Sequence, residues 1–235
     1  ESLALAPMGA GIDLMVHIAT TVAGWSGAVT LVPAMPTAGL AAVALGGAWL
    51  VIWRGRARLI GPAIVAAGLL PLAFATPPDI LIEGTGKLTA IRTDSGRLLV
   101  SSARTARFER GIWSRQLAIA DAPAVWPARG RAADAPLDCD ISGCLLRLGG
   151  KLVALPRTEA ALIEDCWRAD AVIASEPIRG RCPAGVVIDR FDLWREGGHA
   201  VWLRERRIRV ETVNGRRGHR PWVQRPDTRP AGEGS

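Results

Sequence analysis

Histidine side chains, on which many catalytic metal sites depend, are few in this sequence. The three His are His17, His199 and His219. Neither His199 nor His219 has a second ligand-forming residue two or four positions further along the chain, a spacing at which two side chains reach one metal ion. Zinc catalysis requires three protein ligands and an open position for activated water. We therefore expect no metal site, and we assign no cofactor and no catalytic residue.

A glycine-rich segment, Gly84-Thr85-Gly86-Lys87, has some of the residues of a phosphate-binding loop. Such a loop has the pattern G-x-x-x-x-G-K-[ST] and opens a helix. Here the glycine spacing differs, and an alternating, strand-like segment follows. We interpret the segment as a turn between two strands.

Four cysteines lie in the second half of the chain: Cys139, Cys144, Cys166 and Cys182. Their spacing lacks the C-x-x-C pairs of a zinc knuckle, and four Cys allow three pairings. If this region is exported, oxidation is expected. A Cys139–Cys144 bond would close a short loop, and a Cys166–Cys182 bond would tie the end of a helix to a later loop. Free buried thiols are the alternative.

Arginine supplies 27 of the 29 basic side chains, and the formal net charge is +7. Residues 194–229 hold 10 Arg and 4 acids. Strand alternation places Ile208 and Val210 on one face and Arg207 and Arg209 on the other. Basic grooves with aromatic platforms bind single-stranded nucleic acid. The candidate nucleic-acid-binding residues are Arg204, Arg206, Arg207, Arg209, Arg216, Arg217, Arg220 and Trp222. A solvated sheet face and tail is the alternative.

Charge divides the chain into two parts. Residues 1–78 hold 3 Arg, no Lys and 2 acids, whereas residues 79–235 hold the other 26 basic residues and 20 acids. Pro77-Pro78 marks the boundary between them. The sequence therefore predicts terminal membrane helices within 1–78 and a water-exposed domain, with an Arg- and Pro-rich tail, over 79–235.

Two uncharged runs, residues 37–53 and 59–76, are 17 and 18 residues long. Crossing the hydrocarbon of a bilayer takes about 17–25 apolar residues. The loop at 54–58 holds three Arg, and short basic loops stay in the cytoplasm. We expect a helical hairpin in the bacterial inner membrane, as part of a multi-pass protein, with residues 79–235 in the periplasm. A pair of buried core helices is the alternative.

A third apolar stretch covers residues 8–32, with apolar residues at helical spacing. Asp13 and His17 share one face of it. Ionisable side chains at membrane depth are functional by default. An interfacial helix, whose polar side faces water, is the interpretation we favour over that functional pair.

Beyond Pro78 the pattern alternates between strands and a helix. Thr158 is the expected N-cap of a helix over 159–168. Residues 121–137 are loop-like, and little regular structure is expected after Arg216. The expected strands are 80–82, 87–93, 97–101, 144–148, 151–155, 171–174, 186–188, 200–203 and 206–213. This order predicts a layered α/β sandwich.

The order of elements resembles the end of the ComEC family, the competence DNA-internalisation channels of bacteria. That family's membrane domain precedes a metallo-β-lactamase-like domain that opens with a D-V-G-Q-G-D-A turn. The stretches similar to the family are the turn at 84–88, the strand at 97–101, the strand at 168–173 and the ending at 190–222. The resemblance covers nearly the whole chain and implies a truncated αββα metallo-β-lactamase-like domain.

The residues that hold metal in that fold are replaced here. Lys87 and Ser101 stand where active relatives have Asp. Arg157 ends a Leu-Pro-Arg run in place of Thr-Gly-Asp, and Ser175-Glu176-Pro177 replaces His-His-Gly. The segment that would carry the H-x-H-x-D-H cluster, between Ser101 and Cys139, is missing. We interpret the domain as a zinc-free, degenerate form of the fold.

The resemblance implies an inner-membrane channel for uptake of single-stranded DNA in natural transformation, with a non-catalytic periplasmic domain that guides DNA. The implied partners are single-stranded DNA, the membrane, other competence proteins and the polypeptide upstream of Glu1. Two alternatives stay open: a membrane-tethered metallohydrolase or nuclease, and a structural docking module of another transporter. Metal-dependent cleavage would select the former, and salt-sensitive DNA binding would argue against the latter.

Overall fold

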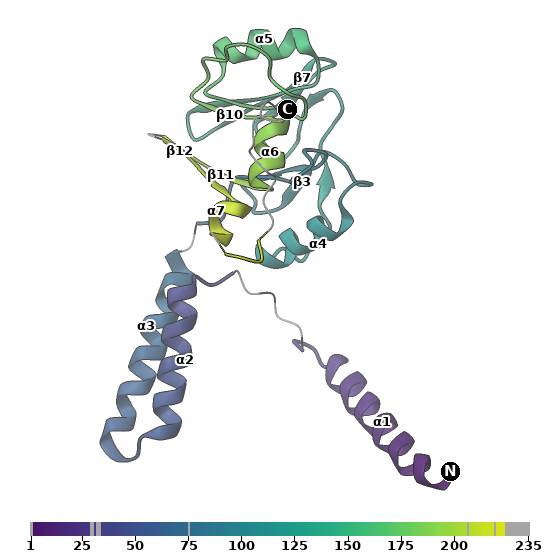
Figure 1. Ribbon diagram of the computed structural model, residues 1–235, viewed down its shortest axis with the longest axis vertical. Coiled ribbons are helices and arrows are strands. Elements are labelled where there is room, and N and C mark those ends of the chain that lie inside the picture. The colour runs from purple at the N-terminus through teal and green to yellow at the C-terminus, as the bar shows by residue number, and fades with distance from the viewer. Residues whose placement is uncertain are drawn as a thin grey trace, which may run out of the picture.

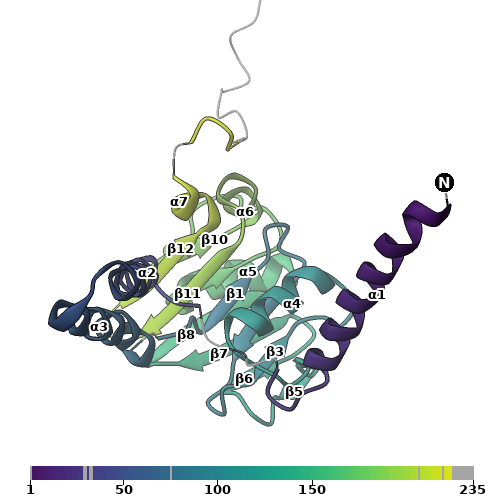
Figure 2. The ribbon, with the colours of Figure 1, turned by 90° about the horizontal axis from the view of Figure 1, so that it is seen from below.

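The computed structural model describes residues 2–28, 31, 34–74, 76–205, 207–218 and 220–223. Three helices come first, α1 (Ser2–Ala23), α2 (Thr37–Ile52) and α3 (Ile60–Phe74), and a mixed α/β domain follows them (Figure 1). Residues 7–28 of the first segment are exposed, including Asp13 and His17. Seen from below, α1 and the α2–α3 pair lie on opposite sides of the α/β domain (Figure 2).

Helices α2 and α3 pack against each other through glycines. They are joined by a short 3-10 helix, η1 (Gly55–Leu59). A Cβ added to Gly39 would lie 2.7 Å from the carbonyl oxygen of Gly68, and one added to Gly46 would lie 2.9 Å from that of Gly61. Small residues let helix backbones approach this closely. The two backbones therefore meet at two glycine pairs, spaced seven residues apart on each helix.

Large apolar side chains point outward from this hairpin. Leu45 is 68% exposed, Val51 85% and Leu70 61%. The segment Gly55–Leu72 is long and apolar enough to cross a membrane by length and composition, and Thr37–Ile52 is a shorter apolar helix. The two helices expected from the sequence are present, and α3 ends two residues before the expected limit of its apolar run.

The first sheet of the α/β domain has the order β12-β11-β1-β2-β3-β4. Its neighbouring strands are antiparallel except for the parallel pair β3–β4. The chain enters this sheet at a central strand, and β11 later pairs with that strand. The strands are β1 (Ile80–Ile82), β2 (Thr89–Arg92), β3 (Leu98–Val100), β4 (Ala124–Val125), β11 (His199–Arg204) and β12 (Arg207–Thr212).

The second sheet has the order β10-β9-β8-β7-β6-β5. The pairs β8–β9 and β9–β10 are parallel, and the others are antiparallel. All of its strands come from one continuous stretch of the chain. They are β5 (Gly130–Arg131), β6 (Leu137–Cys139), β7 (Gly143–Leu148), β8 (Lys151–Pro156), β9 (Ala171–Ile173) and β10 (Val186–Ile188).

The two sheets face each other and enclose the largest core cluster, which includes Ile91 of the first sheet and Leu146 of the second. Helix α4 (Arg107–Gln116) covers the outer face of the first sheet through Trp113. Helix α5 (Glu159–Arg168) covers the outer face of the second sheet through Leu162. The domain is therefore layered helix, sheet, sheet, helix (Figure 1), as the sequence predicted in outline.

Some helices differ from the sequence expectation. The predicted helix α5 is present, and the Thr158 hydroxyl accepts a hydrogen bond from the Ala161 N–H at 3.3 Å. Helix α4 occupies the interval between Ser101 and Cys139, where no element was expected. Two further helices, α6 (Arg190–Glu196) and α7 (Val213–Arg217), are short and were not predicted. Strand β2 begins at Thr89, two residues later than expected.

Candidate nucleic-acid interface

The outer face of strands β11 and β12 carries three of the predicted Arg residues. Trp202 lies directly opposite Arg209, and Arg204 lies opposite Arg207. The alternate positions, Val201, Leu203, Ile208 and Val210, pack in or against the core between the sheets. The predicted alternation is therefore confirmed. We call the surface formed by Trp202, Arg204, Arg207, Arg209 and Glu211 the β11–β12 face.

This face lies beside the part of the sheet that α4 covers. Trp113, Leu117 and Ile119 pack on the cluster formed by Leu88, Ala90, Leu98 and Val100, which lie in and around β2 and β3. The apolar cluster at α4 extends across the sheet as far as Leu81 on β1. Arg204, Arg207 and Arg209 are exposed, and Trp202 is partly exposed.

Arg204 is tied to the fold by Asp79, which is 4% exposed. The Asp79 carboxylate accepts hydrogen bonds from the Leu203 N–H at 2.8 Å and from the Arg204 guanidinium at 3.2 Å. It also accepts one from Arg92 at 3.3 Å. Arg204 therefore stabilises the start of β1 against β11, and only part of its donor capacity is left for a ligand.

Arg209 is held over an aromatic ring. Its guanidinium carbon lies 5.2 Å from the centroid of the Trp202 ring, and its nitrogen pairs with the Glu211 carboxylate. The Trp202 indole N–H in turn donates to the carbonyl oxygen of Thr76 at 2.9 Å. Thr76 belongs to the segment that connects α3 to β1. The β11–β12 face is therefore fixed directly to the chain that leaves the hairpin.

The remaining predicted residues lie elsewhere or are not described. Arg206 lies outside the described residues. Arg216 and Arg217 are exposed in the last turn of α7, and Arg220 lies 6.0 Å from the ring centroid of Trp222 beyond it. The structure thus brings Arg204, Arg207 and Arg209 together on one strand pair. The other four described candidates follow that pair in the chain: Arg216, Arg217, Arg220 and Trp222.

Both disulfides expected from the sequence are present. Cys139 and Cys144 are bonded across directly opposite positions of β6 and β7, and both are buried in the core between the sheets. Cys166 of α5 is bonded to Cys182 in the segment before β10. The second bond therefore ties the outer helical layer to the second sheet. The described residues contain no free cysteine.

Five residues at positions that the resemblance compares with metal-binding motifs line one cavity. They come from different strand ends and loops of the two sheets: Lys87, Ser101, Arg157, Ser175 and Glu176. The cavity volume is about 840 Å³. The sequence indicated these positions one at a time, through the resemblance, and the structure places them together. Arg190, which lines the same cavity, begins the stretch at 190–222 but was not predicted as a site residue.

The lining residues do not fit a zinc site. Zinc takes Cys, His or carboxylate ligands, and a catalytic site needs three of them. Among the described residues that line the cavity, Glu176 is the single carboxylate, and the one Cys, Cys144, is in a disulfide. Within the described ranges, no group of three or more His, Cys, Asp or Glu is arranged to hold a metal ion. The described lining of this cavity therefore lacks the ligands for a catalytic zinc ion.

Two titratable groups at strand ends, His199 and Asp170, have lowered pKa values. His199 is buried, which is the main cause of its lowered pKa, although a hydrogen bond to the Gly197 carbonyl and the charges of Asp192 and Glu196 oppose the shift. The Asp170 carboxylate has a lowered pKa, chiefly because it accepts the Leu152 N–H at 2.9 Å, and Lys151 adds to the shift. His199 is the first residue of β11, and Asp170 directly precedes β9.

A second cavity, of about 900 Å³, lies between α5 and the strands β6 and β7. Its charged lining mixes both signs, with Arg131 and Arg168 beside Asp138 and Asp165. Burial raises the pKa of Asp165, and the neighbouring Glu164 adds to the increase. This mixture gives the second cavity no clear preference for a charged ligand.

Comparisons of the chain with protein-family models, with curated proteins and with solved structures each found no match.

Proposed function

We propose that this chain is a membrane-anchored, non-catalytic part of a channel for uptake of single-stranded DNA, and that its α/β domain guides the strand. The observation that carries the proposal is the β11–β12 face. It combines exposed Arg207 and Arg209 with the Trp202 ring, on a surface hydrogen-bonded to the segment that follows α3. Cations and aromatic rings are the two components of surfaces that bind single strands.

The exposed apolar surface of the hairpin supports the membrane position. In water, contiguous exposed apolar surface of this extent is unfavourable, whereas in lipid it faces a matching solvent. The Trp49 and Trp53 rings stack at 4.8 Å at the Arg-containing end of the hairpin. Tryptophan is enriched at the membrane–water boundary, and short Arg-rich loops favour the cytoplasmic side. The proposed topology therefore has η1 in the cytoplasm and the α/β domain in the periplasm.

The four-layer order supports the family resemblance as part of the proposal. A helix–sheet–sheet–helix sandwich is the arrangement that the resemblance implies, and the replaced motif positions gather in one cavity. A degenerate metallo-β-lactamase-like domain would have this arrangement without the ligands for zinc. In this proposal the domain acts by binding DNA and other proteins of the uptake machinery.

The test is a salt titration of oligothymidylate binding to the full chain in detergent. Each phosphate contact on a single strand contributes about −0.7 to the slope of log affinity against log salt. The variant Arg207→Gln/Arg209→Gln is expected to make that slope shallower by about 1–1.5. Its matched control is Arg179→Gln/Arg181→Gln, which removes two exposed Arg from the segment before Cys182 and is expected to keep the slope.

The outcomes separate the alternatives. Equal slopes for the two double variants would show that general charge, and not the β11–β12 face, attracts the strand. Absence of binding at low salt would contradict the guiding role and favour a structural docking module. Strand cleavage that disappears with a chelator would favour a metallonuclease instead.

A further inference from the structure

The cavity between the sheets is lined by several basic side chains that are not part of the β11–β12 face. Of the described residues, Lys87, Arg157 and Arg190 line it together with one acid, Glu176, and these three cations and one carboxylate sum to a net charge of +2. The other polar side chains on the wall are the hydroxyls of Thr85, Thr89, Ser101, Ser102, Thr105 and Ser175. A concave surface of one sign with hydroxyl donors attracts anions.

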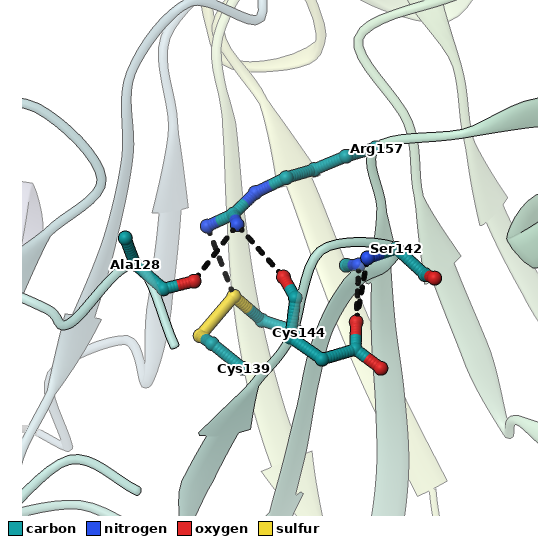
Figure 3. The surroundings of a disulfide bond; sticks show 7 residues. Ala128, Cys139, Ser142, Cys144 and Arg157 are labelled. Carbon is teal, nitrogen blue, oxygen red and sulfur yellow. Dashed lines mark hydrogen bonds between the residues drawn. A yellow bond between two sulfur atoms is a disulfide. The ribbon is translucent and has the colours of Figure 1, made fainter. Parts of the chain in front are cut away.

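Arg157 is held at the wall by uncharged partners. Its guanidinium donates to the carbonyl oxygens of Ala128 at 3.2 Å and Asp140 at 3.1 Å, and it lies 3.4 Å from the Cys144 sulfur (Figure 3). The Cys139–Cys144 disulfide closes the loop that supplies one of these carbonyls. None of these partners is a carboxylate, and Arg157 takes part in no ion pair among the described residues.

Lys87 is positioned by the glycine turn before it. Gly86 has a φ of +75°, a conformation that favours glycine, and a Cβ there would lie 3.0 Å from the Leu193 side chain and 3.4 Å from Ser175 Cα. The turn therefore packs closely against the opposite wall of the cavity. Lys87 itself is exposed, and it takes part in none of the ion pairs found among the described residues.

Arg190 is brought to the same cavity by the cap of α6. The Asp189 carboxylate accepts the N–H groups of Phe191 at 2.8 Å and Ile178 at 3.1 Å. It thereby joins the start of α6 to the loop that contains Glu176. Arg190, like Lys87, is exposed and has no ion pair in the part of the chain that the structure describes.

An exposed aromatic ring accompanies this charge. Trp194 lines the cavity and is 58% exposed. It lies four residues after Arg190 on α6, so the two side chains project from the same face of the helix. An exposed indole beside cations offers a surface on which a nucleobase can stack while a phosphate is held next to it.

We propose that this cavity binds one nucleotide, with the phosphate held by Lys87, Arg157 and Arg190 and the base stacked on Trp194. Its volume, about 840 Å³, lies within the range of about 300–1,000 Å³ found for small-molecule sites. The nucleotide has two possible sources, a free mononucleotide or one unit of a single strand. The second source rests on the proposed function, and the first does not.

The experiment measures binding of thymidine 5′-monophosphate and of thymidine to the full chain in detergent. The phosphate-bearing probe is expected to bind and the nucleoside to bind at least about tenfold more weakly. The variant Lys87→Met/Arg190→Gln is expected to weaken monophosphate binding by about tenfold or more. Glu176→Gln is expected to strengthen it by about threefold, because it removes the acid from the wall. Arg157 is left unchanged because it supports the fold.

The control Arg179→Gln/Arg181→Gln removes the same charge outside this cavity and is expected to keep monophosphate affinity. Equal binding of thymidine and its monophosphate, or equal losses in the two double variants, would overturn the cavity proposal. Oligothymidylate then distinguishes the sources, because Lys87→Met/Arg190→Gln weakens it only if a strand enters the cavity. Monophosphate binding without any oligothymidylate binding would support the cavity and contradict the proposed function.

Discussion

In the α2–α3 hairpin, two helix backbones meet at glycines and the large aliphatic side chains point outward. In the two-sheet domain, aliphatic side chains such as Ile91 and Leu146 meet in the interior, and charged side chains such as Arg207 are exposed. If the hairpin lies in lipid, as proposed, the two regions follow one rule, that apolar surface avoids water, in two different solvents. The exposed surface of each region therefore indicates what surrounds it. Four predictions test this contrast, from the largest expected effect to the smallest.

The largest effect is expected from charges on the outside of the hairpin. Leu45 and Leu69 are exposed near the middle of α2 and α3. If they face lipid, Leu45→Asp/Leu69→Asp disfavours insertion by about 5–7 kcal/mol, since each central charge costs about 2.5–3.5 kcal/mol. The chain should then leave the membrane pellet, whereas Leu45→Ala/Leu69→Ala should stay in it. An Asp variant that remains in the pellet as firmly as the parent would refute a lipid-facing hairpin.

A buried carboxylate gives the next effect, within the domain. Asp79→Asn weakens the hydrogen bonds to Leu203, Arg92 and Arg204, and we expect a loss of about 3 kcal/mol in the free energy of unfolding. Asp134→Asn is the matched control, because Asp134 pairs with Arg97 at an exposed position. That control is expected to cost at most about 0.5 kcal/mol. Urea titration followed by far-UV circular dichroism measures both values.

The two disulfides are expected to differ in their contribution. Cys166 and Cys182 are 16 residues apart, and Cys139 and Cys144 are 5 apart. A longer closed loop restricts the unfolded chain more. Replacing both Cys166 and Cys182 by Ala should therefore cost about 3 kcal/mol in the free energy of unfolding, and replacing both Cys139 and Cys144 by Ala about 2 kcal/mol. The same urea titration, with the other bond kept oxidised, provides the comparison. The reverse order would mean that packing around Cys144 outweighs loop length.

Protonation of His199 is expected to have the smallest effect. Its pKa in the folded domain is lowered below 6.5, so the unfolded chain binds the proton more tightly and stability falls as the pH drops below about 6.5. His199→Gln should flatten this part of the profile. Asp170 acts in a lower window, because its lowered pKa adds stability that is lost only below pH 3.8. A His199→Gln profile that keeps its slope between pH 5 and 6.5 would assign that slope to another group.

The elements that the sequence predicted well have strong local signals. The uncharged runs predicted α2 and α3, and Thr158 predicted the start of α5. Alternation in the last strand predicted that Arg207 and Ile208 lie on opposite faces of the sheet. Helix α4 has the weakest signals, because Gly111 lies within it and its N-cap, Ala106, supplies no side-chain bond. Helix α6 did have a signal that was missed, since Asp189 and Asp192 form a capping box.

The cavity could not be predicted from local pattern. Lys87, Arg157 and Arg190 are far apart in the sequence, and they meet because the ends of strands from both sheets converge at one place. Strand order across a sheet depends on long-range pairing, such as that of Ile80 with Val201, and no local spacing encodes it. The interactions of Arg204 with Asp79 were hidden for the same reason.

The order of the strands also sets the order in which the domain can assemble. Strands β5 to β10 all come from residues 130–188, so the second sheet can form as soon as that stretch is available. Strand β1 must wait for β11, which is among the last elements of the described chain. Until then β1 has an unpaired edge, and such edges invite wrong pairing. We therefore expect the β11–β12 face to be the last surface completed, so that chains interrupted before residue 199 expose the β1 edge beside the hairpin.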